Sequence, residues 1–227
     1  MAQFVIFDVD GTLVDSVDLH AQAWADAFRR FGYDVSAAQA RTQIGKGGDQ
    51  LMPVFLPKAD LERVGEDLDK WRGEHYREHY LPRVKGFPGV RPLFDALLAR
   101  GLRPGLATSS KPEDLERLKE VAGIADLDLP ATTSGDVERS KPHPDIFQAT
   151  LAKLGAAPGD TVAVGDSPYD AEAAGKAGVK AVGVLCGGFP EVDLKRAGCI
   201  ALYRDPADLL AKLDESPLGA GGDTIRQ

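Results

Sequence analysis

Two aspartates placed two residues apart follow an apolar segment near the start of the chain. The run of residues 4–7 leads directly into Asp8 and Asp10, and such a run is typical of a strand buried on both faces. Side chains two apart on a strand point to the same side, so both carboxylates are expected at its carboxyl end. Two carboxylates this close repel each other unless a cation lies between them, and oxygen ligands suit magnesium. The pattern predicts a magnesium site in which Asp8 attacks phosphorus and Asp10 transfers a proton.

Hydroxyl side chains end a second apolar run, at Thr108, Ser109 and Ser110. Hydroxyls and the backbone N–H groups that follow them can hold phosphate oxygens. A serine at this place can equally cap the helix that is expected to begin at Pro112, and the two roles are compatible. We expect Thr108 and Ser109 to bind the phosphate group.

One lysine, Lys141, stands just before a helix that is expected to begin at Pro144. An isolated lysine is ordinarily a solvated surface residue. Here the nucleophile, a phosphate group and the transition state together carry more negative charge than one magnesium ion offsets, so a further cation is required. Lys141 is the best candidate for that cation, whereas His143 is expected only to start the helix.

A second acidic pair, Asp166 and Asp170, follows the apolar run of residues 161–164. Asp166 comes directly after this expected strand and is predicted to bind magnesium. With Ser167 as N-cap, Asp170 takes the third helical position, where an acid closes a capping box. Asp170 therefore has two roles open to it: the capping box, and a place beyond the direct metal ligands from which it binds metal-bound water or orients Lys141.

In their order along the chain, these segments resemble the four motifs of the haloacid dehalogenase (HAD) superfamily of phosphotransferases. The strings DVDGTLVDS from Asp8, KPHPDIF from Lys141 and GDSPYD from Gly165 match motifs I, III and IV, and Thr108 stands at the motif II position. An isolated Asp-x-Asp would instead suggest only an acidic turn. The resemblance covers residues 4 to about 203 and is closest to the subgroup of phosphoglycolate phosphatase-like enzymes and β-phosphoglucomutases with a helical cap.

The resemblance implies a two-step phosphatase for small phosphate monoesters such as phosphoglycolate or sugar phosphates. Asp8 attacks the phosphorus in line and forms an aspartyl-phosphate, while Asp10 protonates the leaving alcohol and later deprotonates water. It also implies that magnesium is held by Asp8, Asp166 and the backbone carbonyl of Asp10, and that Lys141 and Thr108 offset charge beside it.

Apolar runs and helical patterns alternate along most of the chain, and these elements must position the residues described above. This alternation predicts right-handed crossovers and a parallel sheet, an α/β core of Rossmann-like type. Pro130 makes the third run the weakest strand prediction. The expected strands span residues 4–7, 102–107, 127–132, 161–164, 181–185 and 200–203, and the expected helices span 89–100, 112–121, 144–154, 168–177 and 206–213.

The alternation stops between about Ser16 and Lys85, where the sequence is helical. Residues 17–31 carry an apolar stripe with helical spacing, and two further helical stretches end near Tyr80. About seventy residues are too many for a simple crossover, so we expect a small helical cap inserted after the first strand, which would exclude water and select the substrate. The predicted boundaries are 1–15 and 86–215 for the core, 16–85 for the cap and 216–227 for a flexible tail.

Two residues of the expected cap are candidates for contact with substrate. Lys46 lies in the glycine-rich turn of residues 44–49 and either contacts an anionic leaving group or stays exposed. His20 faces either the cleft or the core of the cap, and Trp24 four residues later favours packing.

A phosphosugar mutase of the β-phosphoglucomutase type is the main alternative function. His20 and Trp24 resemble positions in the mutases, but Gly48 or Asp49 stands where the mutases have an arginine in the cap. The acid at Asp10 argues against the dehalogenases and phosphonatases of the superfamily, which lack it. A signalling receiver domain needs about half this length and leaves the helical insert unexplained. An inactive scaffold does not fit a complete set of charged site residues.

Charge and hydropathy limit the classes of partner. The 227 residues include 27 lysines and arginines against 35 aspartates and glutamates, a formal net charge of −8, which argues against general binding of nucleic acid or anionic membranes. No apolar run approaches the roughly 20 residues that span a bilayer. Met1 leads directly into the first strand, so no targeting segment is expected. These features favour a cytoplasmic enzyme, monomer or homodimer, with reduced Cys186 and Cys199.

Overall fold

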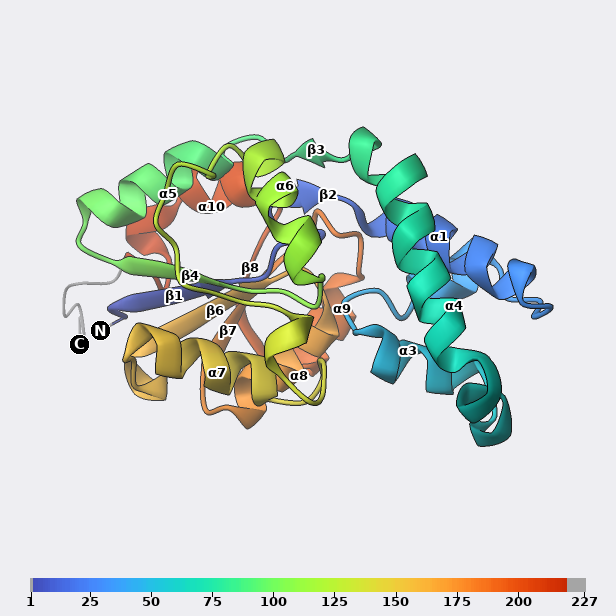
Figure 1. The fold of residues 1–227 in the computed structure, drawn as a ribbon. Coiled ribbons are helices and arrows are strands. Elements are labelled where there is room, and N and C mark those ends of the chain that lie inside the picture. Colours follow the sequence, from blue (N-terminus) through green and yellow to red (C-terminus); the bar gives the residue numbers. More distant parts are fainter. Residues whose placement is uncertain (1, 220–227) are drawn as a thin grey trace.

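The computed structural model describes residues 2–219. One sheet of six parallel strands, in the order β5-β4-β1-β6-β7-β8, forms the centre of the core, and helices cover both of its faces (Figure 1). This arrangement confirms the predicted α/β class and the parallel sheet. The strands are β1 (Phe4–Phe7), β4 (Arg103–Ala107), β5 (Ala131–Thr132), β6 (Thr161–Gly165), β7 (Lys180–Val184) and β8 (Cys199–Tyr203).

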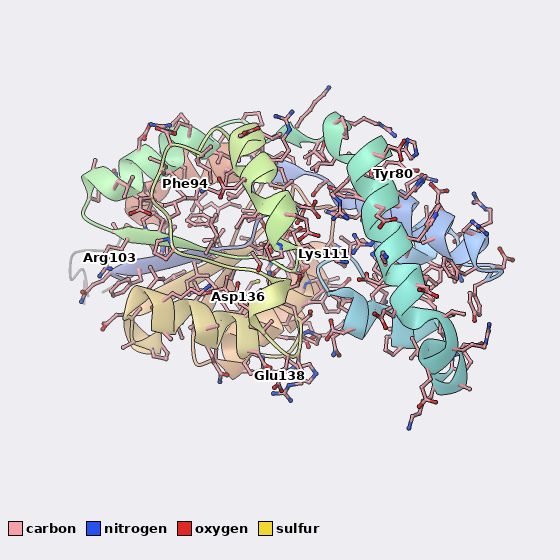
Figure 2. All side chains as sticks on the ribbon, in the orientation of Figure 1. Tyr80, Phe94, Arg103, Lys111, Asp136 and Glu138 are labelled. Atoms are coloured by element: carbon pink, nitrogen blue, oxygen red, sulfur yellow. The ribbon has the colours of Figure 1, made fainter. Side chains whose placement is uncertain are left out.

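The central strand β1 is apolar throughout because both of its faces are covered. Val5 and Phe7 belong to the apolar cluster on the side of α5, α6 and α10, and the Phe7 ring lies 4.8 Å from that of Phe94 (Figure 2). Phe4 and Ile6 belong to the cluster on the opposite side, with α7 and α8. These helices are α5 (Val90–Ala99), α6 (Pro112–Ala122), α7 (Asp145–Leu154), α8 (Pro168–Lys176) and α10 (Pro206–Ala211).

A group of four helices lies beside the carboxyl ends of the strands (Figure 1). They are α1 (Val17–Arg30), α2 (Ala37–Arg41), α3 (Gly48–Phe55) and α4 (Lys58–His79). They enclose an apolar cluster of their own, which includes Trp24, Phe28, Leu51 and Leu68. Among the described residues, no helix has the length and apolar character needed to cross a membrane.

The chain enters and leaves this helical group through two short paired strands, β2 (Val14–Asp15) and β3 (Lys85–Gly86). They run antiparallel, with Val14 opposite Gly86 and Asp15 opposite Lys85. Neither strand is predictable from its sequence, because two residues are too few to display the alternation that identifies a strand.

The structure differs from the prediction at several short elements and at the C-terminal tail. The strand prediction over residues 127–132 is reduced to β5, which begins just after Pro130. Leu218 is only 3% exposed and belongs to the main apolar cluster, so a flexible tail from residue 216 is wrong for residues 216–219. The rest of that predicted tail, 220–227, lies outside the described residues. The unpredicted elements include α2, α9 (Glu191–Arg196) and four short 3-10 helices, Leu81–Arg83, Ser134–Asp136, Pro158–Asp160 and Leu213–Glu215.

Candidate active site

Three neighbouring strands deliver the predicted site residues to one edge of the sheet. Asp8 follows β1, Thr108 follows β4 and Asp166 follows β6, and β1 pairs with both of the other strands. The strand order runs from β1 toward β5 on one side and from β6 toward β8 on the other. Open α/β sheets bind ligands at the carboxyl ends of strands where the order reverses in this way.

A fully buried ammonium group joins two of the carboxylates. Lys141 Nζ lies 2.5 Å from Asp8 Oδ1 and 2.7 Å from Asp170 Oδ1, and it donates a hydrogen bond to the backbone carbonyl of Ala107 at 2.8 Å. Burial alone would lower the pKa of Lys141, but the two carboxylates outweigh burial and hold that pKa above its usual value. Lys141 is therefore a permanent positive charge at the base of the site.

Asp170 closes the capping box at the start of α8 and also contacts Lys141. Its Oδ2 accepts hydrogen bonds from the backbone N–H of Ser167 at 3.1 Å and from the Ser167 hydroxyl at 2.6 Å, which closes the capping box at the start of α8. Its Oδ1 faces Lys141. The start of α8 is thereby tied to the position of the ammonium group.

Asp8, Asp166 and Asp170 form a buried acidic cluster that could hold a metal ion. One carboxylate oxygen from each lies within 4.8 Å of the others. The three negative charges face the single ammonium of Lys141, which leaves a formal charge of −2 when all three are ionised. A divalent cation with oxygen ligands, such as Mg²⁺, balances that charge.

The pKa values of Asp8 and Asp166 are shifted upward, which agrees with the excess of negative charge in this cluster. Burial, with smaller contributions from Asp170 and Asp10, raises the pKa of Asp8 to about 7 despite the opposing effect of Lys141. Burial, followed by the charges of Asp170 and Asp8, raises the pKa of Asp166 well above its usual value. The hydroxyl of Thr12 is the hydrogen-bond donor to Asp166, at 3.2 Å. The three carboxylates thus provide oxygen ligands that fit a cation, and such a cation would compensate their charge.

Two glycines let the backbone approach the Asp166 carboxylate closely. A Cβ atom at Gly11 or at Gly187 would overlap Asp166 Oδ2. Gly11 also has a φ of +81°, in the left-handed region that glycine tolerates best. The two glycines therefore shape the space beside the acidic cluster.

The Gly187→Ala variant is expected to lose metal-dependent activity because its new methyl group displaces the Asp166 carboxylate. We expect the Mg²⁺ concentration for half-maximal activity to rise at least about tenfold, the loss typical of disturbed support for a metal ligand. Titration of activity with Mg²⁺ measures this shift. Gly159→Ala, where a Cβ meets no atom within 4 Å, is the matched control, and equal Mg²⁺ requirements in both variants would contradict the prediction.

Asp10 lies at the same edge of the sheet, but its side chain contacts hydroxyls and a histidine instead of joining the acidic cluster. Its Oδ1 accepts a hydrogen bond from Ser16 at 2.7 Å and lies 3.0 Å from His20 Nε2. Its Oδ2 accepts from Ser110 at 2.5 Å, with the Thr108 hydroxyl 3.5 Å away. Burial opposes the charge of Asp10, but the charge of His20 and these hydrogen bonds outweigh burial and hold its pKa below the usual range.

His20 links the helical group to the sheet edge. Besides its contact with Asp10, its ring stacks on that of Tyr76 in α4, with ring centroids 4.0 Å apart. The two orientations that the sequence left open are therefore both realised, because one edge of the ring meets the site and one face packs within the helical group.

A cavity of about 50 Å³ connects the sheet edge with the helical group. Lys46 and Ser109 line it together with Asp8, Asp10 and His20. Lys46 Nζ donates to the Gln43 side chain at 2.6 Å and lies 4.6 Å from the centroid of the Tyr169 ring, so it is partly engaged. A larger cavity of about 630 Å³ lies beside Tyr169 and Phe189, but none of the three carboxylates of the acidic cluster lines it.

The sequence of the chain matches one protein family over most of its length. Residues 5–184 match the family described as haloacid dehalogenase-like hydrolase. The chain belongs to the haloacid dehalogenase-like hydrolases. The resemblance inferred from the motifs is therefore confirmed.

Individual members of the HAD-like hydrolases match almost the whole chain. A phosphoglycolate phosphatase from Rhodospirillum rubrum is 31% identical over 222 residues, covering 92% of this chain and 90% of the relative. A phosphorylated carbohydrates phosphatase from Thermotoga maritima is 29% identical and covers 93% and 98%. The crystal structure of a hydrolase from Pseudomonas syringae superposes with a TM-score of 0.87 at 29% identity, covering 95% of this chain and 99% of that one. The chain is accordingly a phosphatase-type enzyme of the HAD-like hydrolases.

Some residues of this HAD-like site were not singled out from the sequence. Thr12 and Ser16 lie within the first motif, and their hydroxyls reach Asp166 and Asp10 respectively. Ser110 was considered as a phosphate-binding hydroxyl or a helix cap, but not as the partner of Asp10 that its hydroxyl proves to be. Arg72 and Asp114, which line the cavity, belong to helices whose sequence patterns carry no motif.

Proposed function

We propose that this protein is a magnesium-dependent phosphatase that hydrolyses small phosphate monoesters of the phosphoglycolate or sugar-phosphate type through an aspartyl-phosphate on Asp8. The observation that carries the proposal is the buried acidic cluster, in which Asp8 is paired with Lys141 and leaves a charge of −2 for a divalent cation. The phosphatases among the relatives support the reaction type.

Asp8 and Asp166 would bind magnesium, together with the backbone carbonyl of Asp10. A bound magnesium ion supplies charge compensation for the phosphate oxygens and keeps both acids ionised. Asp170 would act through Lys141, because it lies 2.7 Å from that ammonium.

In the first step, a carboxylate oxygen of Asp8 attacks phosphorus while the bond to the leaving oxygen breaks. Lys141 holds Asp8 Oδ1 and offsets the negative charge that accumulates on the phosphoryl oxygens. Thr108 and Ser109, which follow β4, would donate to those oxygens together with Lys141. Positioning and charge compensation of this kind account for most of the catalysis of phosphoryl transfer.

Asp10 would carry the proton between the two steps. In the arrangement described, its three hydrogen-bond donors favour the ionised form, which is the form needed to deprotonate water in the second step. Burial is the largest single influence on Asp10 and raises its pKa. A substrate that displaces Ser110 or His20 would remove part of what stabilises the charged form, which would favour uptake of the proton that the leaving alcohol requires.

The mutase alternative has less support. Gly48 lines the cavity, and Asp49 accepts a hydrogen bond from the backbone N–H of Ser140 at 3.1 Å, so neither supplies a cation for a second phosphate at that place. Hydrolysis is favoured because it needs only water as the second acceptor.

The test is phosphate release from a panel of phosphate monoesters, with Mg²⁺ and with a chelator. The panel includes acetyl phosphate, phosphoglycolate, several polyol and sugar phosphates, and β-glucose 1-phosphate. We expect Mg²⁺-dependent release from a small subset. Conversion of β-glucose 1-phosphate to its 6-phosphate isomer without release would instead establish the mutase, and no turnover of any member would contradict phosphoryl transfer altogether.

The Asp10→Asn variant is expected to lose about 10²–10⁴-fold in kcat, the range typical of general acid–base catalysis. Its affinity for Mg²⁺ should stay within a few-fold of the native value, because the side chain of Asp10 lies outside the acidic cluster. Calorimetric titration of Mg²⁺ into both proteins separates the two effects. A variant that binds no Mg²⁺ would make Asp10 a side-chain ligand and not the proton carrier.

A further inference from the structure

Three buried side-chain atoms around the cavity have no hydrogen-bond partner among the residues that the structure describes. They are Nε of Arg72, the hydroxyl of Tyr76 and Oδ1 of Asp114. Arg72 and Asp114 line the cavity, and Tyr76 stacks on His20, which lines it as well. Buried polar groups are ordinarily paired, so this side of the cavity is incomplete without a ligand.

The carboxylate of Asp114 is buried, and its Oδ1 has no hydrogen-bond partner among the described residues. Asp114 lies in the first turn of α6 with only 6% of its surface exposed. The nearest cation is Arg77, whose Nη1 is 3.6 Å from Asp114 Oδ1, beyond hydrogen-bond distance, and the same nitrogen donates to Glu113 at 3.1 Å. Burial raises the pKa of Asp114. A hydrogen-bond donor that enters from the cavity would satisfy this carboxylate.

Two cations that line the cavity, Lys111 and Arg72, are paired with one acid. Asp69 in α4 lies 3.0 Å from Lys111 Nζ and 3.4 Å from Arg72 Nη2. Figure 2 shows Lys111 where the start of α6 faces α4. Among the residues that line the cavity, Asp114 is the acid besides Asp8 and Asp10, whereas the two lysines, Lys46 and Lys111, are engaged with Gln43 and Asp69.

We propose that Asp114 and Arg72 form a leaving-group subsite that selects phosphate esters of polyols over esters that carry a carboxylate. This inference rests on the proposed phosphatase function. A hydroxyl group has the chemistry to complete both atoms, because it can donate to a carboxylate oxygen such as Asp114 Oδ1 and accept from an N–H such as that of Arg72 Nε. The carboxylate of phosphoglycolate can accept from Arg72 but is repelled by Asp114.

The size of the cavity limits the leaving group further. A water molecule requires at least about 10–15 Å³ of such space, so about 50 Å³ admits only a few heavy atoms in the arrangement described. A polyol of about three carbons is therefore the leaving group we expect to be hydrolysed best, and kcat/KM should fall for polyols of four and five carbons.

The first experiment compares kcat/KM of the native enzyme across one series of esters. Glycerol 3-phosphate, erythritol 4-phosphate and ribitol 5-phosphate carry free hydroxyls, while propyl phosphate and phosphoglycolate carry none. We expect the best polyol ester to exceed both by at least about tenfold, since a site built to bind a hydroxyl discriminates against analogues that lack it. A preference for phosphoglycolate over every polyol ester would overturn the proposal.

The second experiment changes Asp114 itself. Asp114→Leu removes the acceptor at similar size and should lower the kcat/KM ratio of the best polyol ester to propyl phosphate at least about tenfold, mainly through KM. Asp114→Asn keeps an acceptor oxygen and should retain part of that ratio. Glu116→Gln, at an exposed residue of α6 that pairs with Lys119, is the matched control and should keep the native ratio.

The outcomes separate this proposal from the function on which it rests. If the native enzyme fails to hydrolyse acetyl phosphate with Mg²⁺, the proposed phosphatase function fails. If acetyl phosphate is hydrolysed but Asp114→Leu lowers all esters equally, or leaves the ratio unchanged, Asp114 is structural and the subsite is refuted. Circular dichroism of each variant identifies a folding defect, in which case Asp114→Asn alone decides through its ratio.

Discussion

Replacing Asp8 by asparagine is expected to reduce turnover of every phosphate ester by at least about 10⁴-fold, the scale seen when a nucleophile is removed. The amide has nearly the shape of the carboxylate, so the fold should persist, but it is neutral and does not attack phosphorus. Burial and the neighbouring carboxylates raise the pKa of Asp8, which means that its charge is unfavourable in the folded protein. The variant should therefore be at least as stable as the native protein in chelator.

Steady-state kinetics and thermal unfolding in chelator measure both effects. Asp15→Asn removes the same charge from an exposed residue of β2 and should leave turnover unchanged. Acid-quenched native enzyme should carry phosphate on the peptide that contains Asp8, and the variant should not. Turnover of Asp8→Asn within tenfold of native would eliminate Asp8 as the nucleophile.

Replacing Lys141 by methionine is expected to affect both activity and stability. Methionine fills most of the buried volume but leaves Asp8 and Asp170 without their shared cation. Removing one partner of a buried ion pair typically costs about 3–5 kcal/mol, so the free energy of unfolding in chelator should fall by that amount. The kcat should fall by at least about 10²-fold, because among the described residues Lys141 is the cation that forms an ion pair with Asp8.

Magnesium provides the diagnostic for this variant. A divalent cation would compensate the same carboxylates, so saturating Mg²⁺ should narrow the stability gap between Lys141→Met and the native protein. Lys153→Met, at a half-exposed lysine of α7 that pairs with Asp136, should lose no more than about 1 kcal/mol. If Lys141→Met is as stable as native in chelator, the ammonium does not compensate the acidic cluster.

The sequence predicts the core well because its signals are local. An apolar run followed by Asp8 was sufficient to place β1 correctly, and Ser167 with Asp170 predicted the capping box found in α8. The two-residue period of a strand placed Asp8 and Asp10 at one end of β1. It does not describe their side chains, because the backbone turns after Val9, whose carbonyl accepts from Leu13 at 2.8 Å.

The contacts across the cavity could not be predicted from local patterns. The approach of Asp114 to Arg72 depends on how α4 and α6 face each other, and neither helix shows a motif that fixes this. The short strands β2 and β3 pair residues some seventy positions apart, and such pairing leaves no periodic trace in either segment. The motifs therefore predicted which residues meet at the carboxyl ends of the strands but not which residues line the cavity opposite them.

The pairing of β2 with β3 also has a consequence for how this protein can be rebuilt. Residues facing each other on antiparallel strands lie about 4.5–5.5 Å apart, so the chain leaves the sheet at Asp15 and returns at Lys85 through almost the same point. Excision of the helical group would thus leave two chain ends that a tight turn could join, but it would also remove Ala23 and Tyr76 from the main apolar cluster. Such a truncated enzyme would retain Asp8, Lys141, Asp166 and Asp170, yet Asp10 would lose its contact with His20. Grafting a different module at this junction would exchange substrate recognition while leaving the acidic cluster unchanged.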